Sequence, residues 1–309
     1  MRSIEFNIKD VDGVEIHVYK WKTEGTPKAV VQIAHGMGEH SGRYEYFAQK
    51  LIENGYAVYI NDHRGHGKTA KNKDDLGYIG DTDGFNWMIK DMYEVTLIAK
   101  KDYKDVPIFL LGHSMGSFLT QKYIALYGKE LKGALLSGTN GKQGQKLKMG
   151  MALAKLEVSM KGPRNKGKSL NNLIFKGYNS KFEPERTLFD WLTSDKGEVD
   201  KYITDEYCGH AFTSSFFYYF FKGLDELSKP HVLNNIPREL PIYIFSGSED
   251  PVGEEGKGVT NLYNTYKKIG IQDVTCKIYQ GGRHEMLNEV NKNEVISDII
   301  TWMEHRIHD

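Results

Sequence analysis

The 309-residue sequence has few cysteines, no long apolar run and no net charge. Its two cysteines, Cys208 and Cys276, exclude a disulfide framework and a cysteine-based zinc cluster. The longest apolar run is the six aromatic residues Phe216 to Phe221, far below the roughly 18 residues that a membrane span needs. The 41 basic and 41 acidic residues cancel, which excludes a protein that binds nucleic acid through its overall charge. With no apolar stretch of signal-peptide length near the start, the sequence predicts a soluble protein of a reducing, cytoplasmic compartment.

The sequence contains enough apolar residues, 39% of the chain, to bury a large core. In its first part, short apolar runs alternate with segments of helical spacing. This alternation predicts a mostly parallel sheet that helices cover on both faces, which is an α/β fold. The run 14–21 alternates as an edge strand does. The expected strands are 14–21, 29–36, 56–62, 107–114 and 132–138, and the expected helices are 43–54, 83–101 and 115–128.

The alternation of strands and helices stops after residue 138, and the residues that follow contain only helix-like pieces between glycines and prolines. Strand patterns return at 240–250 and 273–284, before a closing helical pattern at 291–307. Surface loops accept long insertions at little entropic cost, so we expect a helical cap inserted into one sheet-based core. The expected domains are the core, residues 1–138 and 238–309, and the cap, residues 139–237.

The segment Gly112-His113-Ser114-Met115-Gly116 has the pattern G-x-S-x-G of a nucleophile elbow. It stands where this motif must stand, after a predicted buried strand and before a predicted helix. The sharp turn exposes the serine hydroxyl, and side chains at the flanking glycines would clash with neighbouring elements. The turn also puts the N–H of Met115 at the positive end of a helix, where an oxyanion can be stabilised. The pattern predicts Ser114 as a nucleophile.

A serine nucleophile needs a base, and the base needs an orienting acid. On this kind of sheet the acid follows the serine along the chain and the histidine comes last. Asp250 and His284 both follow predicted strands, in the required order. Glu249 is the rival acid, but Pro251 and the local spacing favour Asp250. We therefore expect the triad Ser114, Asp250 and His284.

The second oxyanion donor is expected in the loop His35-Gly36-Met37-Gly38, which follows a predicted strand. Its glycines let the backbone approach a substrate, and the N–H of Met37 is the expected donor. His35 is interpreted as a structural brace that hydrogen-bonds this loop. Met37 and Met115 together form the expected oxyanion hole.

Five segments of the chain carry a resemblance to a known family: HGMGEHSGRY (35–44), NDHRGHGKT (61–69), GHSMG (112–116), GSEDPV (247–252) and GGRHE (281–285). At these residues the chain resembles the α/β-hydrolases of the monoacylglycerol lipase and lysophospholipase type. The resemblance spans nearly the whole predicted core. It implies the α/β-hydrolase fold, Ser114 as nucleophile, Asp250 as acid, His284 as base, and Met37 with Met115 as oxyanion hole. The segment 189–209 resembles the cap of bacterial members, which are commonly assigned as lysophospholipases or general carboxylesterases.

Patterns that suggest a cofactor or a metal do not hold in this chain. The segment 67–69 ends like a phosphate-binding loop, but Asp62 stands where the first glycine of that loop belongs. His63 and His66 lie in a glycine-rich turn with that one carboxylate, for which structural bracing is favoured over metal binding. The sequence therefore predicts no cofactor and no metal.

The predicted cap contains an aromatic segment, Phe212 followed by FFYYFF (216–221). A helix that is apolar on all sides is buried or faces lipid. Two roles are open: the segment docks the cap on the core, or it lines an acyl-chain tunnel above Ser114. The candidate substrate-binding residues are Phe212, Phe216, Phe217 and Phe220.

The predicted cap is also basic. Between Lys142 and Lys181 the chain has ten Lys or Arg residues and one acid, Glu157. This asymmetry favours peripheral contact of the cap with an anionic lipid surface or with acidic esters, unless the lysines only solvate helix faces.

These features predict a serine carboxylester hydrolase that forms an acyl-enzyme. Its expected partner is a small-molecule acyl ester such as a monoacylglycerol or a lysophospholipid, and no nucleic acid is expected. A serine aminopeptidase or an acyltransferase on the same scaffold remains open. So does a non-catalytic ligand-binding protein of this fold, which would not need a complete triad.

Overall fold

The computed structural model, which describes residues 3–142 and 144–307, is built on an eight-stranded sheet. Its strands are β1 (Ile4–Lys9), β2 (Glu15–Trp21), β3 (Ala29–Ala34), β4 (Tyr56–Asn61), β5 (Ile108–His113), β6 (Gly133–Ser137), β7 (Ile242–Gly247) and β8 (Val274–Tyr279). Their order in the sheet is β1-β2-β4-β3-β5-β6-β7-β8. β2 pairs antiparallel with β1 and β4, and all other neighbours are parallel. The predicted mostly parallel sheet is confirmed.

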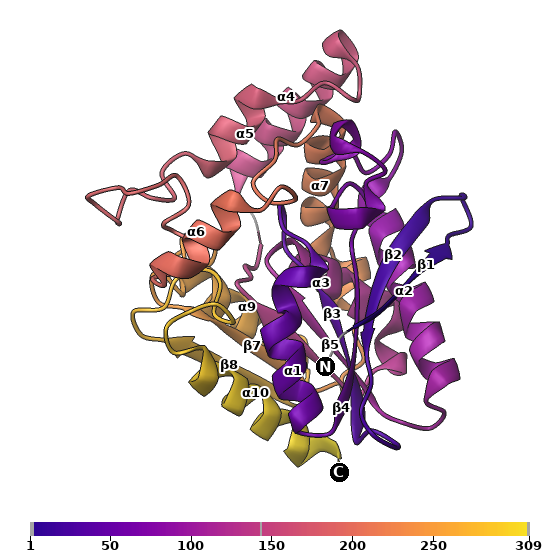
Figure 1. Cartoon of the computed structure of the whole chain (residues 1–309). Coiled ribbons are helices and arrows are strands. Elements are labelled where there is room, and N and C mark those ends of the chain that lie inside the picture. Colours follow the sequence, from indigo (N-terminus) through magenta and orange to yellow (C-terminus); the bar gives the residue numbers. More distant parts are fainter. Residues whose placement is uncertain (1–2, 143, 308–309) are drawn as a thin grey trace.

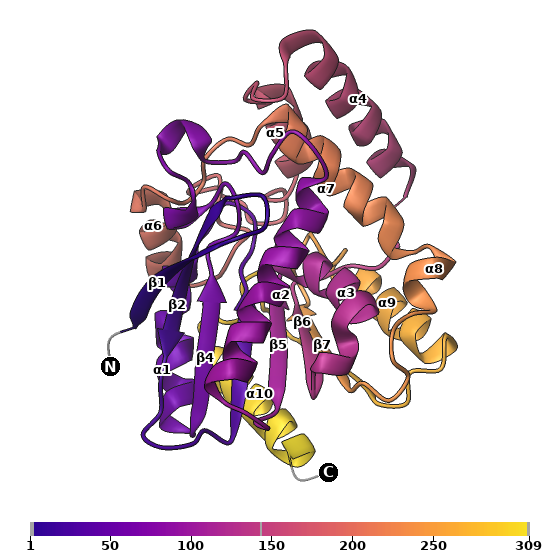
Figure 2. The same ribbon diagram turned by 90° about the vertical axis from the view of Figure 1, so that its right-hand side faces the viewer.

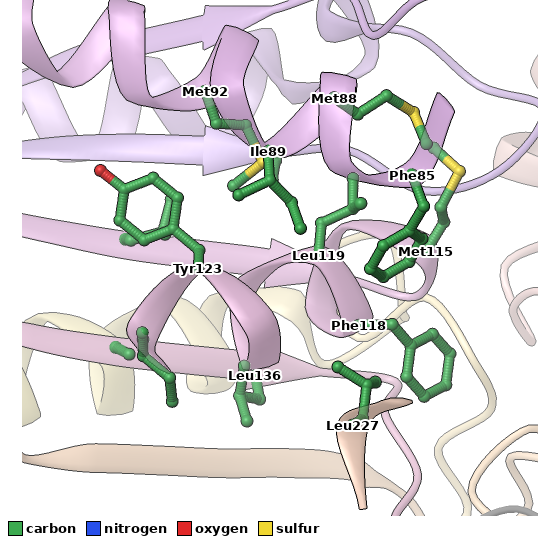
Figure 3. Packing of buried hydrophobic residues seen from close by; sticks show 14 of the residues in the cluster. Phe85, Met88, Ile89, Met92, Met115, Phe118, Leu119, Tyr123, Leu136 and Leu227 are labelled. Atoms are coloured by element: carbon green, nitrogen blue, oxygen red, sulfur yellow. The ribbon is translucent and has the colours of Figure 1, made fainter. Parts of the chain in front are cut away.

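Helices cover both faces of this sheet (Figures 1 and 2). Those helices are α1 (Glu45–Glu53), α2 (Gly84–Asp102), α3 (Met115–Tyr127), α9 (Lys257–Lys268) and α10 (Lys292–Ile307). α1 and α10 contribute to one core cluster together with Val31, and α2, α3 and α9 contribute to another together with Val30. Val30 and Val31 are successive residues of β3, and their side chains point to opposite faces of the sheet, as successive strand residues do. Figure 3 shows side chains of α2, among them Ile89, packed against those of α3, among them Leu119.

The sheet differs from the sequence-based expectation at one edge. The run 14–21 was expected as an edge strand, but β2 lies between β1 and β4, and the outer strands are β1 and β8. β1 was not among the expected strands, although Ile4, Phe6 and Ile8 alternate with polar residues as in a half-buried strand. Its backbone pairs with β2 from Ile4 opposite Lys20 to Lys9 opposite Glu15. Main-chain pairing with β2 and the packing of Phe6 and Ile8 against the core together define this strand.

Between β6 and β7, the described residues of the segment 139–237 form helices and an isolated bridge. Figures 1 and 2 show these helices above one end of the sheet. It is the end where the parallel strands finish, because the inserted segment bonds there to loops that follow β8 and β3. Glu285 N, after β8, donates to Leu192 O at 2.7 Å, and Gly209 N donates to Gly38 O, after β3, at 3.0 Å. The boundaries of a separate cap domain stay a prediction. The helices are α4 (Gln145–Lys161), α5 (Lys168–Phe175), α6 (Lys196–Thr204), α7 (Ser214–Leu227) and α8 (Pro230–Leu233).

The sequence suggested that the aromatic helix α7 is apolar on all sides, but the structure shows one side that is partly exposed. Phe216 and Phe217 are fully buried, whereas Tyr218 and Tyr219 are only half-buried. The hydroxyl of Tyr219 donates to the backbone oxygen of Asp81 at 2.6 Å. Tyrosine can occupy the outer side of a helix because its ring packs while its hydroxyl finds a polar partner.

The inner side of α7 docks the inserted segment on the core. α7 packs against α4, α2 and α3. The ring of Phe220 lies 6.1 Å from that of Phe85 in α2 and 6.2 Å from that of Phe118 in α3, between centroids. Gly223 permits this approach, because a Cβ there would lie 2.3 Å from the ring of Phe85. The docking role of the aromatic segment is thus structural fact, whereas the tunnel stays a prediction.

Candidate active site

Ser114 lies at a sharp turn between β5 and α3, with φ 50° and ψ −117°. This backbone conformation is strained for a residue that has a side chain. The turn is also crowded, since a Cβ at Gly112 would lie 2.3 Å from Gly116 O, and one at Gly116 would lie 2.0 Å from Ala34 O. Both clashes are with backbone, so only glycine fits at these two positions. The G-x-S-x-G pattern therefore has a steric cause that includes the end of β3.

His284 and Asp250 meet below the protein surface, each on a loop that follows a strand. His284 Nδ1 lies 2.9 Å from Asp250 Oδ1, and the two side chains are 2% and 0% exposed. The same Oδ1 accepts from Val252 N at 2.9 Å, and Oδ2 accepts from Ser246 Oγ at 2.7 Å. Glu249, the rival acid, is exposed. The structure thus brings Asp250, and not Glu249, to His284.

The electrostatics of this pair decide which nitrogen of the imidazole carries the proton. Burial alone would raise the pKa of Asp250 and lower that of His284. Their mutual attraction and hydrogen bond outweigh burial, so the pKa of Asp250 lies below its usual 3.8 and the pKa of His284 lies above its usual 6.5. An ionised carboxylate can only accept a hydrogen bond, so Nδ1 is the protonated nitrogen. Nε2 of the neutral imidazole therefore keeps a lone pair that can take a proton.

Ser114 and His284 converge on the same region from two sides. The ring of His113 lies 4.8 Å from the ring of His284, and a Cβ at Gly36 would lie 3.2 Å from both His113 Cδ2 and Ser114 Cβ. Within the described residues, Ser114 Oγ does not hydrogen-bond to His284 Nε2. Such contacts commonly tighten only once a substrate is bound.

The two residues expected to supply oxyanion donors, Met37 and Met115, lie on different elements next to Ser114 or Gly36. Met115 is the first residue of α3, and the first N–H groups of a helix have no partner within the helix. Met37 belongs to the loop after β3, next to Gly36 and its close approach to Ser114. The expected oxyanion hole, formed by these two N–H groups, stays a prediction.

His35 fixes the direction of the Met37 N–H. Its Nε2 accepts from His63 N at 2.9 Å, so Nδ1 must carry the proton, and Nδ1 donates to Gly36 O at 2.8 Å. In a trans peptide the C=O and the next N–H point in opposite directions. A held Gly36 carbonyl therefore also holds the Met37 N–H, which gives the expected brace its physical content.

With this geometry in place, the relatives can be compared. Residues 25–291 match the family described as serine aminopeptidase, S33. The chain belongs to this family. Monoglyceride lipase of Rattus norvegicus is 30% identical over 305 residues, which cover 97% of this chain and 90% of that protein. Monoacylglycerol lipase of Mycolicibacterium smegmatis is 27% identical, and the match covers 97% of this chain and 96% of that protein.

Among solved structures, a thermostable carboxyl esterase from Bacillus coagulans, determined in complex with glycerol, matches with a TM-score of 0.92. It is 29% identical to this chain, and the match covers 99% of both chains. These relatives confirm the predicted α/β-hydrolase fold of the monoacylglycerol lipase type. This member of the S33 family is a serine hydrolase.

Two aromatic side chains of the inserted segment reach the site, although the sequence analysis assigned no role to either. The ring of Trp191 lies 5.0 Å from the ring of His284. Tyr202 of α6 donates its hydroxyl to Gly38 O at 2.9 Å, beside Met37. Both stand in the segment 189–209 that resembles the caps of relatives, which is the only sequence signal that pointed to them.

The four predicted cap phenylalanines divide into two groups. Phe212 comes close to the loop of Met37, because a Cβ at Gly38 would lie 3.6 Å from its ring. Phe216 lies 4.4 Å and Phe217 6.0 Å from Phe212 between ring centroids. Phe220 lies against α2 and α3, as described above. Contact with substrate stays a prediction for all four.

Two further carboxylates flank the site, and one cation pairs with both. Arg43 Nη1 lies 2.7 Å from Glu39 Oε2 and 2.6 Å from Glu285 Oε1, and Nη2 lies 2.7 Å from Glu285 Oε2. The three side chains are nearly buried. Their charges add to the effect of Asp250, because both glutamates also raise the pKa of His284.

Among the described residues, the donor atoms of His40, Asp205 and Cys208 lie within 4.8 Å of one another, close enough for a metal ion. Both nitrogens of His40 already have partners, since Nε2 lies 2.9 Å from Asp205 Oδ2 and Nδ1 accepts from Gly42 N at 3.2 Å. Burial also raises the pKa of the Cys208 thiol, which opposes the thiolate that a metal requires. We therefore interpret this group as a hydrogen-bonded histidine and aspartate beside a thiol.

We expect His284 to titrate above pH 6.5, because nearby carboxylate charge favours its protonated form more than burial disfavours it. Asp250→Asn removes the nearest charge, so the pKa of His284 should fall. Titration of the imidazole resonances by NMR measures both values. Glu249→Gln is the matched control, since that exposed carboxylate lies next to Asp250 in the chain and should leave the titration unchanged. A wild-type value below 6.5, or equal shifts in both variants, would contradict this assignment.

Proposed function

We propose that the protein is a serine carboxylester hydrolase with the catalytic triad Ser114, His284 and Asp250. The proposed oxyanion hole consists of the N–H groups of Met37 and Met115. The observation that carries this proposal is the buried contact of 2.9 Å between His284 Nδ1 and Asp250 Oδ1. This contact leaves Nε2 of the neutral imidazole free to act as a base.

In the proposed reaction, His284 Nε2 takes the proton of Ser114 Oγ as this oxygen attacks the ester carbonyl carbon. The carbonyl oxygen becomes an oxyanion that accepts hydrogen bonds from Met37 N and Met115 N. The imidazolium, stabilised by Asp250, gives its proton to the leaving alcohol, and the acyl group stays on Ser114 Oγ. Water, deprotonated by the same imidazole, then attacks the acyl carbon. The bond from that carbon to Ser114 Oγ breaks, the imidazolium returns its proton to Oγ, and the carboxylic acid is released.

We infer a substrate with a single acyl chain, such as a monoacylglycerol or a lysophospholipid. The names of the relatives, monoglyceride lipase and monoacylglycerol lipase, support this class. The aromatic rings of Trp191 and Phe212 beside the triad and the oxyanion loop support it independently. Apolar rings favour an acyl chain, because burial of each methylene contributes about 0.8 kcal/mol.

A serine aminopeptidase is the rival that the family description suggests. Such an enzyme needs a carboxylate near the triad to hold the ammonium group of its substrate. Glu39 and Glu285 lie there, but Arg43 already pairs with both. This pairing favours an uncharged ester. Comparing the hydrolysis of monoacylglycerols with that of aminoacyl-arylamides separates the two activities, and transfer to an added alcohol would reveal an acyltransferase.

The triad is tested by three substitutions. Ser114→Ala should lower kcat by about 10⁴-fold or more, as in other serine hydrolases, and should abolish labelling by a fluorophosphonate probe. Asp250→Asn should also be severe, because it removes the charge that orients and stabilises the imidazolium. Glu249→Gln should stay close to wild type. The acid is wrongly assigned if Asp250→Asn is nearly unaffected while Glu249→Gln is inactive.

The aromatic tunnel is tested by the dependence of kcat/KM on acyl-chain length. If Phe212 and Phe217 line the path of the chain, replacing either by Ala should lower the ratio of long-chain to acetyl ester hydrolysis. Phe221→Ala is the matched control, because its ring belongs to the same helix but packs toward Gly150 of α4. The cavity that Phe221→Ala leaves between α7 and α4 should lower Tm, but the ratio of long-chain to acetyl ester hydrolysis should not change. Equal ratios in all three variants would leave α7 with its docking role alone.

We propose further that α4 contacts an anionic lipid surface. It exposes Met149, Leu156 and Met160, to 72%, 54% and 72%, at a spacing that puts them on one face. Four exposed lysines stand on the same helix. A helix with apolar and cationic side chains on its surface binds at the interface of anionic bilayers. In the residues described, no helix is long and apolar enough to cross a bilayer. The lysines are Lys146, Lys148, Lys155 and Lys161.

Sedimentation with vesicles tests this contact. The wild type should bind phosphatidylglycerol vesicles more strongly than phosphatidylcholine vesicles, and the triple variant with serine at 149, 156 and 160 should bind both weakly. Leu126→Ser is the control, since Leu126 is 54% exposed but belongs to α3. Equal binding of the triple variant and the control would remove α4 from the lipid contact.

A further inference from the structure

Arg43 lies where three parts of the site meet. It belongs to the short 3₁₀ turn Ser41–Tyr44, and its side chain is only 10% exposed. Its guanidinium carbon lies 4.9 Å from the ring centroid of Tyr202 in the inserted segment. Burying a guanidinium is costly unless carboxylates with good geometry surround it. Here Glu39 and Glu285 surround it, one from each side of the active site.

The first carboxylate holds the oxyanion loop. Glu39 Oε2 accepts from Arg43, and Glu39 Oε1 accepts from Gly36 N at 2.5 Å. The carbonyl of Gly36 is held by His35, so both polar groups of this residue are fixed. The direction of the Met37 N–H therefore depends on where Arg43 places Glu39.

The second carboxylate holds the loop of the proposed base. Glu285 follows His284 directly, and both of its oxygens contact Arg43, at 2.6 Å and 2.7 Å. Its backbone N–H bonds to Leu192 O at 2.7 Å. The imidazole is thus held by Asp250 on one side, and its loop is held by Arg43 on the other.

We propose that Arg43 is a positioning residue that keeps the Met37 N–H and the His284 imidazole in register, acting through Glu39 and Glu285. This inference rests on the proposed triad and oxyanion hole. Lysine could not replace arginine here, because one ammonium group cannot make a two-pronged contact with Glu285 and also reach Glu39. Groups that align only for the transition state act on kcat rather than on KM.

Glu285 also acts on His284 through its charge. It favours the imidazolium, and its removal should make His284 easier to deprotonate. His113 adds no positive charge beside His284, because burial lowers the pKa of His113 to about 4 and keeps its imidazole neutral. The charged and titratable groups that face His284 are Asp250 after β7, Glu39 after β3, Glu285 beside it, His113 in β5, and Arg43 behind the two glutamates.

The first test is Arg43→Lys, assayed on a monoacylglycerol across pH. Since small misplacements of catalytic groups are costly, kcat should fall about tenfold or more while KM changes by less than about threefold. The acid limb of kcat/KM should stay in place, because the positive charge is kept. Arg64→Lys is the matched control: its side chain is 5% exposed and paired with three carboxylates, Asp10, Asp12 and Asp91. It should lower Tm and leave kcat and the pH profile near wild type.

The second test is Glu285→Gln. His284 must be neutral to act as a base, so lowering its pKa should move the acid limb of kcat/KM to lower pH, and the NMR titration of His284 should move with it. The proposal is overturned if Arg43→Lys loses no more kcat than Arg64→Lys, or loses activity only through KM. It is also overturned if the titration of His284 is unchanged in Glu285→Gln, a result that stands even if Arg43→Lys does not fold.

Failure of the proposed function would look different. The wild type would then neither hydrolyse esters nor react with a fluorophosphonate, whereas the NMR titration of His284 in Glu285→Gln would still report its coupling to Glu285.

Discussion

The buried contact between the imidazole of His284 and the carboxylate of Asp250 is the interaction on which the rest of the site depends. Burial alone would drive both groups toward their neutral forms. Together they keep a carboxylate ionised and an imidazole basic in a place that water barely reaches. This works only while the ends of β7 and β8 keep their spacing. Backbone contact enforces that spacing, because a Cβ at Gly247 would lie 2.0 Å from Gly282 O.

The turn at Ser114 could be predicted from sequence because its pattern is local, although one of its glycines is required by the distant end of β3. A strand, a turn and a helix follow one another within a few residues, and the two glycines are needed wherever the backbones come this close. Asp250 and His284 required one further rule, the order of functional residues along such a sheet. The choice between Asp250 and Glu249 depends on which side chain turns inward after β7. The local spacing favoured Asp250, and the structure shows Asp250 buried against His284 and Glu249 exposed.

Other parts could not be predicted, because contacts between distant segments define them. Trp191 and Tyr202 acquire a place in the site only when the inserted segment folds back over the strand ends. Arg43 stood in a motif that marked the family, but its second partner, Glu285, is 242 residues further along the chain. No local pattern links two such positions.

The inserted segment is therefore more than a cover that selects substrates. Through Tyr202 it bonds the loop that carries Met37, and through the backbone of Leu192 it bonds the loop that carries His284. A substitution that shifts either bond moves the loop of the proposed oxyanion donor or of the proposed base, so we expect it to act on turnover as well as on selectivity. The outer face of α4 takes no part in these bonds, so its exposed Met149 and Met160 can be replaced without disturbing them. Within one segment, then, the residues over the strand ends bond to the loops of the proposed oxyanion donor and base, whereas the outward face of α4, the proposed lipid contact, does not.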